Sequence, residues 1–233
     1  MAKINCKSAE NVWHMLIGYA DESVFNIDDT AKFVYSKENV MDFRQFNLRR
    51  YEEYPKNCHH IRTECYYKII IPYLARLWKF SWNPSDFDYE WIQTEVPGLL
   101  MENAVPKSEF KFSLSIDHEF FDNGNYKILQ CFGEKEPYGN PETMFHRLYK
   151  GGHKCSRIIN ETIDNDRKIL ISGDSFMIPL VPILACYFKE VVLMDNRTIK
   201  SQAEYFENVD FDIVCFEYYT RTGVRKTLVE NFQ

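Results

Sequence analysis

The 233-residue chain contains no stretch of about 20 consecutive apolar residues, so none of its segments is expected to cross a membrane. The N-terminal residues Met1–Cys6 also lack the apolar core and the small-residue cleavage site of a secretory signal peptide. From these two absences we expect a cytoplasmic protein that has no membrane partner.

The chain has no surplus of positive charge. Its formal net charge is −6 and its isoelectric point is about 5.6, so no basic face could dominate the surface without a compensating acidic one. The basic run between Arg44 and Arg50 is short and interrupted. These features argue against a general nucleic-acid-binding protein, and we expect no nucleic-acid partner.

The sequence also lacks the motifs of common cofactor and metal sites. It has no Walker loop or dinucleotide fingerprint, and its cysteines do not show the spacing of structural zinc sites. The seven cysteines are an odd number without the spacing of a disulfide framework, and Cys186 and Cys215 fall inside an expected helix and strand. We therefore expect reduced thiols, no cofactor and no bound metal.

No internal repeat or low-complexity tract divides the chain. At this length, and with 45% hydrophobic residues, the chain can bury one large core. We expect a single domain over residues 1–233.

The most informative segment is a short apolar strand that leads through a Gly-Asp-Ser turn into a helix. Residues Ile169–Ile171 form a compact apolar run of the kind that fills a buried parallel strand, and Gly173 permits a sharp turn that a Cβ would obstruct. Residues Met177–Phe188 are apolar enough for a buried helix, with Pro179 early in it, where a missing N–H group does no damage. Ser175 is therefore predicted at the mouth of this helix, at the carboxyl end of the strand.

That position makes Ser175 the best candidate nucleophile in the chain. Free backbone N–H groups at a helix start can hold an oxyanion, and the helix dipole favours negative charge there, as acyl transfer requires when a carbonyl turns tetrahedral. Asp174 brings a charge to the turn, for which we expect a structural role. Ser175 could instead merely cap the helix that begins at about Phe176, because serine is a preferred N-cap residue.

The residues after this turn continue an alternation of strands and helices. The predicted elements are a strand at Glu190–Asp195, a helix at Ile199–Phe206 and a strand at Asp212–Glu217. This order implies a parallel sheet with right-handed crossovers, in which ligands bind outside the carboxyl ends of the strands. Ser175, Asp195 and Glu217 are all expected at that edge.

The middle of the chain is less regular. Aromatic residues are dense between Trp78 and Trp91, where they suit either the packing of a core, which we favour, or stacking on sugar rings. Prolines and acidic residues suggest an irregular connector over residues 83–106. Phe110–Ile116 alternates like a half-buried strand, and it could pair with a strand over Tyr126–Phe132 through a turn at Asp122–Asn125.

The segment from Lys168 to about Tyr219 resembles the C-terminal part of the SGNH hydrolase-like proteins. The residues that carry this resemblance are the Gly-Asp-Ser-Phe turn at 173–176, the prolines in the helix that follows, and Asp195–Arg197 at the end of the second strand. More narrowly, the segment is similar to the branch named for an Asp-His-His-Trp motif, which is related to the alginate O-acetyltransferases. The resemblance implies a three-layer, flavodoxin-like α/β fold and a serine esterase or O-acetyltransferase activity.

In that branch the order of the catalytic motifs along the chain is permuted relative to ordinary SGNH esterases. Its acidic residue and its histidine are therefore expected before the serine. The chain has an early histidine pair in the sequence Cys58-His59-His60-Ile61, followed by a helix-like run over Cys65–Leu77. If this segment corresponds to the family motif, His60 takes the place of the catalytic base. Cys58 and Ile61 then stand where the family has its aspartate and its tryptophan.

The cysteine at this position leaves several interpretations open. The aspartate of a serine triad holds the histidine tautomer and stabilises the imidazolium, whereas cysteine is a weak hydrogen-bond partner. The site could therefore be a Ser-His dyad, recruit a carboxylate such as Glu64 or Asp28, or be inactive. The two histidines could also be ordinary surface or core residues, the cluster could bind zinc together with Cys65, or Cys58 could itself be the nucleophile.

Two functions follow from the resemblance. In the first, Ser175 attacks an acyl carbonyl, His60 accepts and returns the proton, and backbone N–H groups around Ser175 bind the oxyanion. The substrate would be a carbohydrate, a polysaccharide precursor or an acylated small molecule. In the second, the protein keeps the fold without activity and binds a glycan or a protein partner. The residues expected to contact the substrate are Gly173, Asp174, His59, Asn196 and Arg197.

Overall fold

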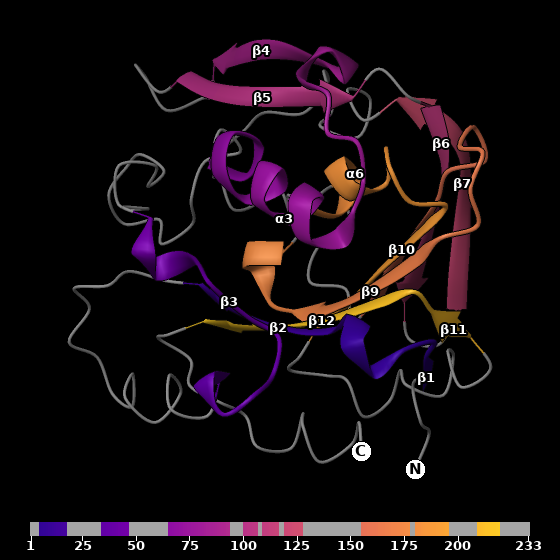
Figure 1. The fold of residues 1–233 in the computed structure, drawn as a ribbon. Coiled ribbons are helices and arrows are strands. Elements are labelled where there is room, and N and C mark those ends of the chain that lie inside the picture. The colour runs from indigo at the N-terminus through magenta and orange to yellow at the C-terminus, as the bar shows by residue number, and fades with distance from the viewer. Residues whose placement is uncertain are drawn as a thin grey trace.

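The structure is a computed structural model, drawn in Figure 1. It describes residues 5–17, 34–46, 65–93, 100–106, 109–116, 119–127, 155–177, 180–195 and 209–219.

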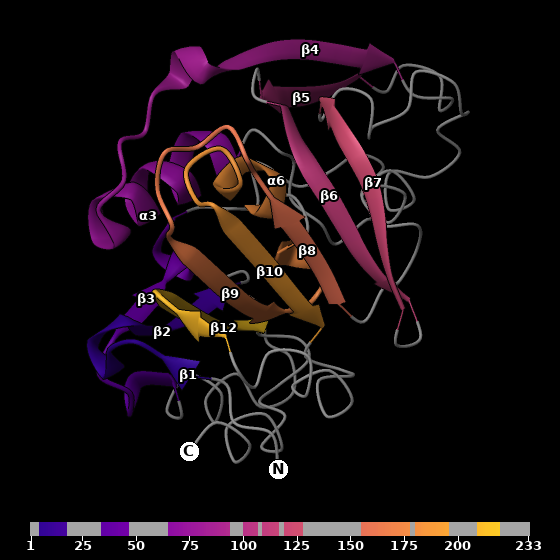
Figure 2. The same ribbon diagram turned by 90° about the vertical axis from the view of Figure 1, so that its right-hand side faces the viewer.

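A mixed sheet forms the centre of the molecule, and the described residues contribute eight strands to it. From one edge to the other these are β3 (Val40–Asp42), β2 (Val12–Ile17), β12 (Ile213–Tyr219), β9 (Lys168–Gly173), β10 (Glu190–Asp195), β8 (Cys155–Ile159), β6 (Glu109–Ile116) and β7 (Glu119–Lys127). The strands from β3 to β10 are parallel to one another. Figure 2 shows β8, β6 and β7 continuing the sheet beyond β10, in antiparallel pairs. The predicted α/β class, with a mainly parallel sheet and a small β addition, is confirmed.

Shorter elements complete the described part of the chain. Two further strand pairs are β1 (Asn5–Cys6) with β11 (Asp210–Phe211), which are parallel, and β4 (Phe87–Gln93) with β5 (Leu100–Pro106), which are antiparallel. The helical elements are η1 (Ala9–Asn11), η2 (Phe43–Gln45), the π-helical turn η4 (Tyr66–Ile70), α3 (Ile71–Trp78), η5 (Pro84–Asp86), η6 (Ser175–Met177) and α6 (Leu180–Leu184).

The central parallel strands are buried on both faces, as their unbroken apolar runs predict. In β9, Ile169 and Ile171 face one apolar cluster, while Leu170 between them faces the other. The first cluster lies between the sheet and the helices α3 and α6, which cover the same face in Figure 1. The predicted helix at Ile199–Phe206 lies outside the described residues.

Helix α3 follows the π-helical turn because of a proline near its start. Pro72 has no N–H group to donate, so the regular hydrogen-bond ladder is interrupted there, which favours a locally widened turn. The helix ends at Lys79, whose φ of 55° is left-handed. The guanidinium of Arg167 then donates to the carbonyl oxygens of Trp78 and Lys79, at 2.7 and 3.2 Å. This contact attaches the end of α3 to the residue before β9.

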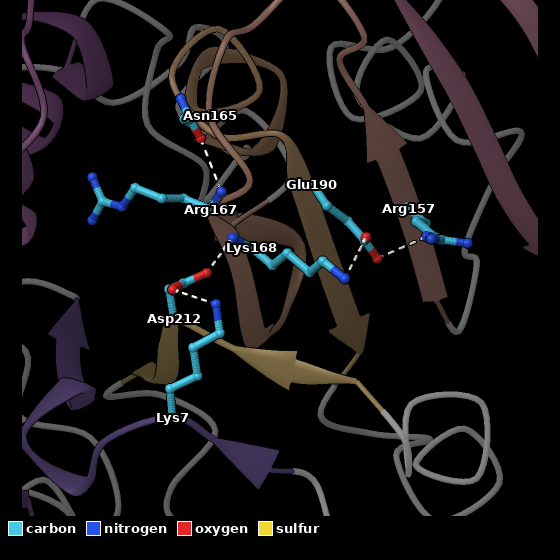
Figure 3. Close-up of polar contacts among 7 residues, drawn as sticks. All are labelled: Lys7, Arg157, Asn165, Arg167, Lys168, Glu190 and Asp212. Carbon is cyan, nitrogen blue, oxygen red and sulfur yellow. Dashed lines mark hydrogen bonds and ion pairs between the residues drawn. The ribbon is translucent and has the colours of Figure 1, made fainter.

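A polar network holds the amino-terminal edge of the parallel strands (Figure 3). Asp212 accepts a hydrogen bond from the backbone N–H of Lys168 at 2.8 Å and forms an ion pair with Lys7. The carboxylate of Glu190 is buried and pairs with Arg157 at 2.8 Å. These contacts lie at the end of the sheet opposite the turn that contains Ser175.

Two predictions for the middle of the chain were wrong. The described residues between 83 and 106 are not an irregular connector, because β4 and β5 pair there as antiparallel strands. The turn signal at Asp122–Asn125 does not connect two strands either, because it lies inside β7, where the register with β6 shifts. Asn123 and Gly124 lie at this shift and form a bulge in β7, which is an edge strand of the sheet. The strand predicted at Phe110–Ile116 is confirmed as β6.

The aromatic residues at the start of the dense segment belong to the core. Trp78 is buried, and Phe80 and Trp82 pack against the same cluster as α3 and α6. Of the described cysteines, none is in a disulfide, and Cys215 is fully buried, as expected for a small apolar side chain. Among the described helices, none combines the length and the apolar character needed to cross a membrane.

Candidate functional site

The Gly-Asp-Ser turn lies at the carboxyl end of β9, as predicted. Gly173 is the last residue of the strand and stands beside Asp195, the last residue of β10. Ser175 is the first residue of η6, which leads towards α6. The serine is therefore at the edge of a parallel sheet where ligands bind in such folds.

Asp174 gives this turn its local conformation. Its carboxylate oxygen Oδ1 accepts the backbone N–H of Phe176 at 2.9 Å, and its carbonyl oxygen accepts the N–H of Met177 at 3.0 Å. This is the hydrogen bonding of an N-cap, in which an aspartate side chain is among the most favourable. The capping role that Ser175 could have filled therefore belongs to Asp174.

Glu217 packs against the same turn from β12. Its side chain is 1% exposed, and its Oε2 atom accepts the backbone N–H of Asp174 at 3.1 Å. A Cβ at Gly173 would lie 3.2 Å from this Oε2 atom and 2.3 Å from Cγ of Met177. Glycine is required here by close approach, because two neighbouring side chains fill the space that a larger residue would need.

The backbone hydrogen bonds of the turn hold the residues on both sides of Ser175. The N–H groups of Asp174, Phe176 and Met177 all donate within the protein. A backbone N–H on the nucleophile itself is suited to bind the oxyanion of a tetrahedral intermediate. The roles of the Ser175 hydroxyl as nucleophile and of its N–H as oxyanion donor stay predictions.

A tyrosine connects the turn to the segment that follows the histidine pair. Tyr66 is fully buried in the π-helical turn, and its hydroxyl donates to the carbonyl oxygen of Phe176 at 2.5 Å. Since Tyr66 follows His60 by six residues, the chain between them spans at most about 20 Å. The fold thus brings the continuation of the histidine segment against the residue next to Ser175.

The remaining residues predicted for the site lie outside the described residues. They are Cys58, His59, His60, Asn196 and Arg197, together with the alternative carboxylates Asp28 and Glu64. Their roles, and the pairing of Ser175 with His60, stay predictions.

Within the part of the chain that the structure describes, no group of three His, Cys, Asp or Glu side chains is arranged to hold a metal ion. Cys65 is buried in the core beside α3. Burial raises the pKa of the Cys215 thiol, and the charge of Glu217 raises it further. A thiol in such surroundings stays protonated and does not act as a nucleophile or a metal ligand.

Two contacts that shape the site were missed from the sequence. The position of Glu217 at the carboxyl edge was predicted, but its contact with Asp174 was not, and Tyr66 gave no signal beyond its place in a predicted helix. A glutamate inside an otherwise apolar strand is the signal that could have identified the first contact.

Known structures resemble the whole described fold. No family model matches the chain, and no curated protein of similar sequence was found. PatB1 from Bacillus cereus with a sulfonyl adduct has a TM-score of 0.65 at 13% identity, over 96% of this chain and 87% of that one. A second structure of PatB1 gives 0.63 at 13% identity, over 91% and 83% of the two chains.

A further similar structure is a DHHW family protein from Eubacterium siraeum. Its TM-score is 0.63 at 15% identity, over 97% of this chain and 83% of that one. At such identities a structural likeness establishes the fold, while substrate and chemistry have to be argued from the site. The protein has the α/β fold shared by PatB1 and this DHHW family protein.

Proposed function

We propose that the protein is a serine esterase or O-acyltransferase in which Ser175 is the nucleophile. The observation that carries the proposal is the Gly-Asp-Ser turn, held at the carboxyl end of β9 with Asp174 as the cap. This supports the proposal, because Asp174 fills the capping role and the carboxyl end of a parallel strand is where ligands bind in such folds.

The structural neighbours add independent support. PatB1 carries a sulfonyl adduct in one of its structures, and sulfonylation is a reaction of nucleophilic side chains. The sequence motif and the fold therefore point to the same kind of chemistry. The structural neighbour from Eubacterium siraeum is a DHHW family protein. This name agrees with the Asp-His-His-Trp branch that the segment from Lys168 to about Tyr219 resembles.

The proposed reaction has two steps. Ser175 Oγ attacks the acyl carbonyl while His60 takes the hydroxyl proton, and the N–H of Ser175 stabilises the oxyanion. The C–O bond to the leaving group then breaks, and His60 returns the proton to the leaving oxygen. In the second step His60 deprotonates water, in an esterase, or a sugar hydroxyl, in a transferase. That acceptor attacks the acyl-serine, the bond between the acyl carbon and Ser175 Oγ breaks, and His60 returns the proton to Oγ.

The substrate proposed for this site is an O-acylated carbohydrate or a small acylated compound. We place His59, Asn196 and Arg197 among the residues that contact it, and for Arg197 the family resemblance implies a position near the pocket. Arginine and asparagine both supply donors for sugar hydroxyl and ester oxygens. The exclusion of water during the second step would decide between hydrolysis and transfer.

One sequence feature favours a second candidate function. Cys58 stands where a triad aspartate is expected, and loss of that aspartate lowers the rate by orders of magnitude in serine hydrolases. A chain that kept the fold without the activity would bind a glycan or a protein partner at the same edge of the sheet.

The two functions are separated by an ester-hydrolysis assay with an aryl acetate. We expect turnover by the wild-type protein and losses of at least about 100-fold in kcat for Ser175→Ala and His60→Ala. Ser172→Ala is the matched control, because Ser172 is a buried serine on the same strand, 1% exposed. Equal background rates for all four proteins, together with saturable glycan binding in calorimetry, would instead favour the binding protein.

A further inference from the structure

Glu217 is a buried carboxylate in an apolar layer. It extends from β12 on the face where Ile213 and Cys215 join the core cluster beneath α3 and α6. Removing a carboxylate from water costs several kcal/mol in proteins unless hydrogen bonds compensate. A residue that breaks the local apolar pattern at such a cost is expected at a functional site.

Glu217 contacts the nucleophile turn at two points. Its Oε2 atom accepts the N–H of Asp174 at 3.1 Å, and hydrogen bonds to charged acceptors are stronger than neutral ones. The side chain of Glu217 also packs against Gly173. A Cβ added at Gly173 would lie 3.2 Å from the Cβ of Glu217. The glutamate and the glycine therefore fit one another as a pair.

The other end of the turn is held from the opposite part of the fold. Tyr66, from the π-helical turn, donates to the carbonyl oxygen of Phe176 at 2.5 Å. Ser175 thus lies between two anchored peptide groups, one bonded to Glu217 and one to Tyr66. Release of either anchor would let the serine and its N–H group shift relative to a bound acyl group.

We propose that Glu217 is a positioning residue for the reaction of Ser175. By accepting the N–H of Asp174, it holds the Gly173–Asp174 peptide in place, so that Ser175 keeps its position relative to a bound acyl group. This inference rests on the proposed function, because positioning is measured through the reaction of the serine. It assigns Glu217 no proton transfer and no contact with substrate.

The test compares two substitutions of Glu217 that are alike in size. Glu217→Met removes the acceptor, and we expect kcat for aryl acetate hydrolysis to fall about 100-fold with KM nearly unchanged, because small misplacements of a reacting group cost this much. Glu217→Gln keeps an amide oxygen for the Asp174 N–H, and we expect kcat within a few-fold of wild type. Glu190→Gln is the matched control, since Glu190 is also buried but lies at the opposite edge of the sheet.

An activity-independent measurement separates failure of this inference from failure of the proposed function. Amide hydrogen exchange at Asp174 should be slow in the wild-type protein and in Glu217→Gln, and faster in Glu217→Met, whether or not any ester is turned over. If the exchange behaves so but no variant is active, the proposed function fails and the anchoring by Glu217 stands. Unchanged exchange in Glu217→Met, or equal losses of kcat in the Met and Gln variants, would overturn the inference.

Discussion

Acidification should destabilise the protein through His14, and the size of the effect follows from its surroundings. His14 is a buried residue of β2, and its ring stacks on Phe216 and Tyr218 at centroid distances of 5.5 and 5.8 Å. Its Nδ1 atom lies 3.0 Å from the Tyr218 hydroxyl. Burial, with a smaller contribution from the charge of Lys37, lowers the pKa of His14 from 6.5 to about 4.

The direction of the change in stability with pH depends on which state, folded or unfolded, binds the proton of His14 more tightly. The unfolded chain binds it at the ordinary pKa of 6.5, and the folded protein only near 4, so the stabilisation is complete above 6.5 and decreases as the pH falls. The neutral state of His14 contributes about 3 kcal/mol to the free energy of unfolding, and about 2 kcal/mol of this is lost between about pH 7 and about pH 5. For a chain of this size, that is a fall of roughly 4 to 8 °C in Tm.

The assay is urea unfolding at both pH values for the wild-type protein and for His14→Asn. Asparagine cannot titrate, yet it keeps a hydrogen-bonding group near the Nδ1 position for the Tyr218 hydroxyl. Because other groups titrate equally in the two proteins, the difference between their pH dependences isolates His14. The same pH dependence in both proteins would refute the assignment of a buried, neutral histidine at this position.

Two further predictions concern the nucleophile turn. Gly173→Ala should lower the free energy of unfolding by about 1 to 3 kcal/mol in urea titrations, because the added Cβ would meet Met177 and Glu217; an unchanged midpoint would show that the turn adapts freely. Tyr66→Phe should cost about 1 kcal/mol by the same measurement, since the carbonyl of Phe176 loses its donor, and full stability in this variant would exclude the hydrogen bond.

The local part of the candidate site could be predicted from the sequence. The strand at Lys168–Gly173, the turn and Ser175 depend on contiguous residues, namely an unbroken apolar run followed by a glycine and a capping aspartate. The strand at Glu190–Asp195 is predictable for the same reason, and its parallel register with β9 is confirmed.

What could not be predicted depends on residues distant in the sequence. The bond between Asp174 and Glu217 joins positions 43 residues apart, and it follows from the register of β9 against β12. The pairing of β4 with β5 is hidden in the sequence, although Phe87–Trp91 alternates apolar and polar residues, because the flanking prolines are typical of loops. In β7, pairing with β6 overrides a local turn preference, as tertiary contacts often do for strands.

The measurement that tests the central claim most directly is mass-spectrometric mapping of a fluorophosphonate label. Such a probe modifies an activated serine and leaves a structural one untouched. If Ser175 is the nucleophile, the wild-type protein is labelled on the peptide that contains Ser175, Ser172→Ala is labelled equally, and Ser175→Ala is not labelled. A protein that takes up no label, or a label that persists in Ser175→Ala, would contradict the assignment of Ser175 as the nucleophile.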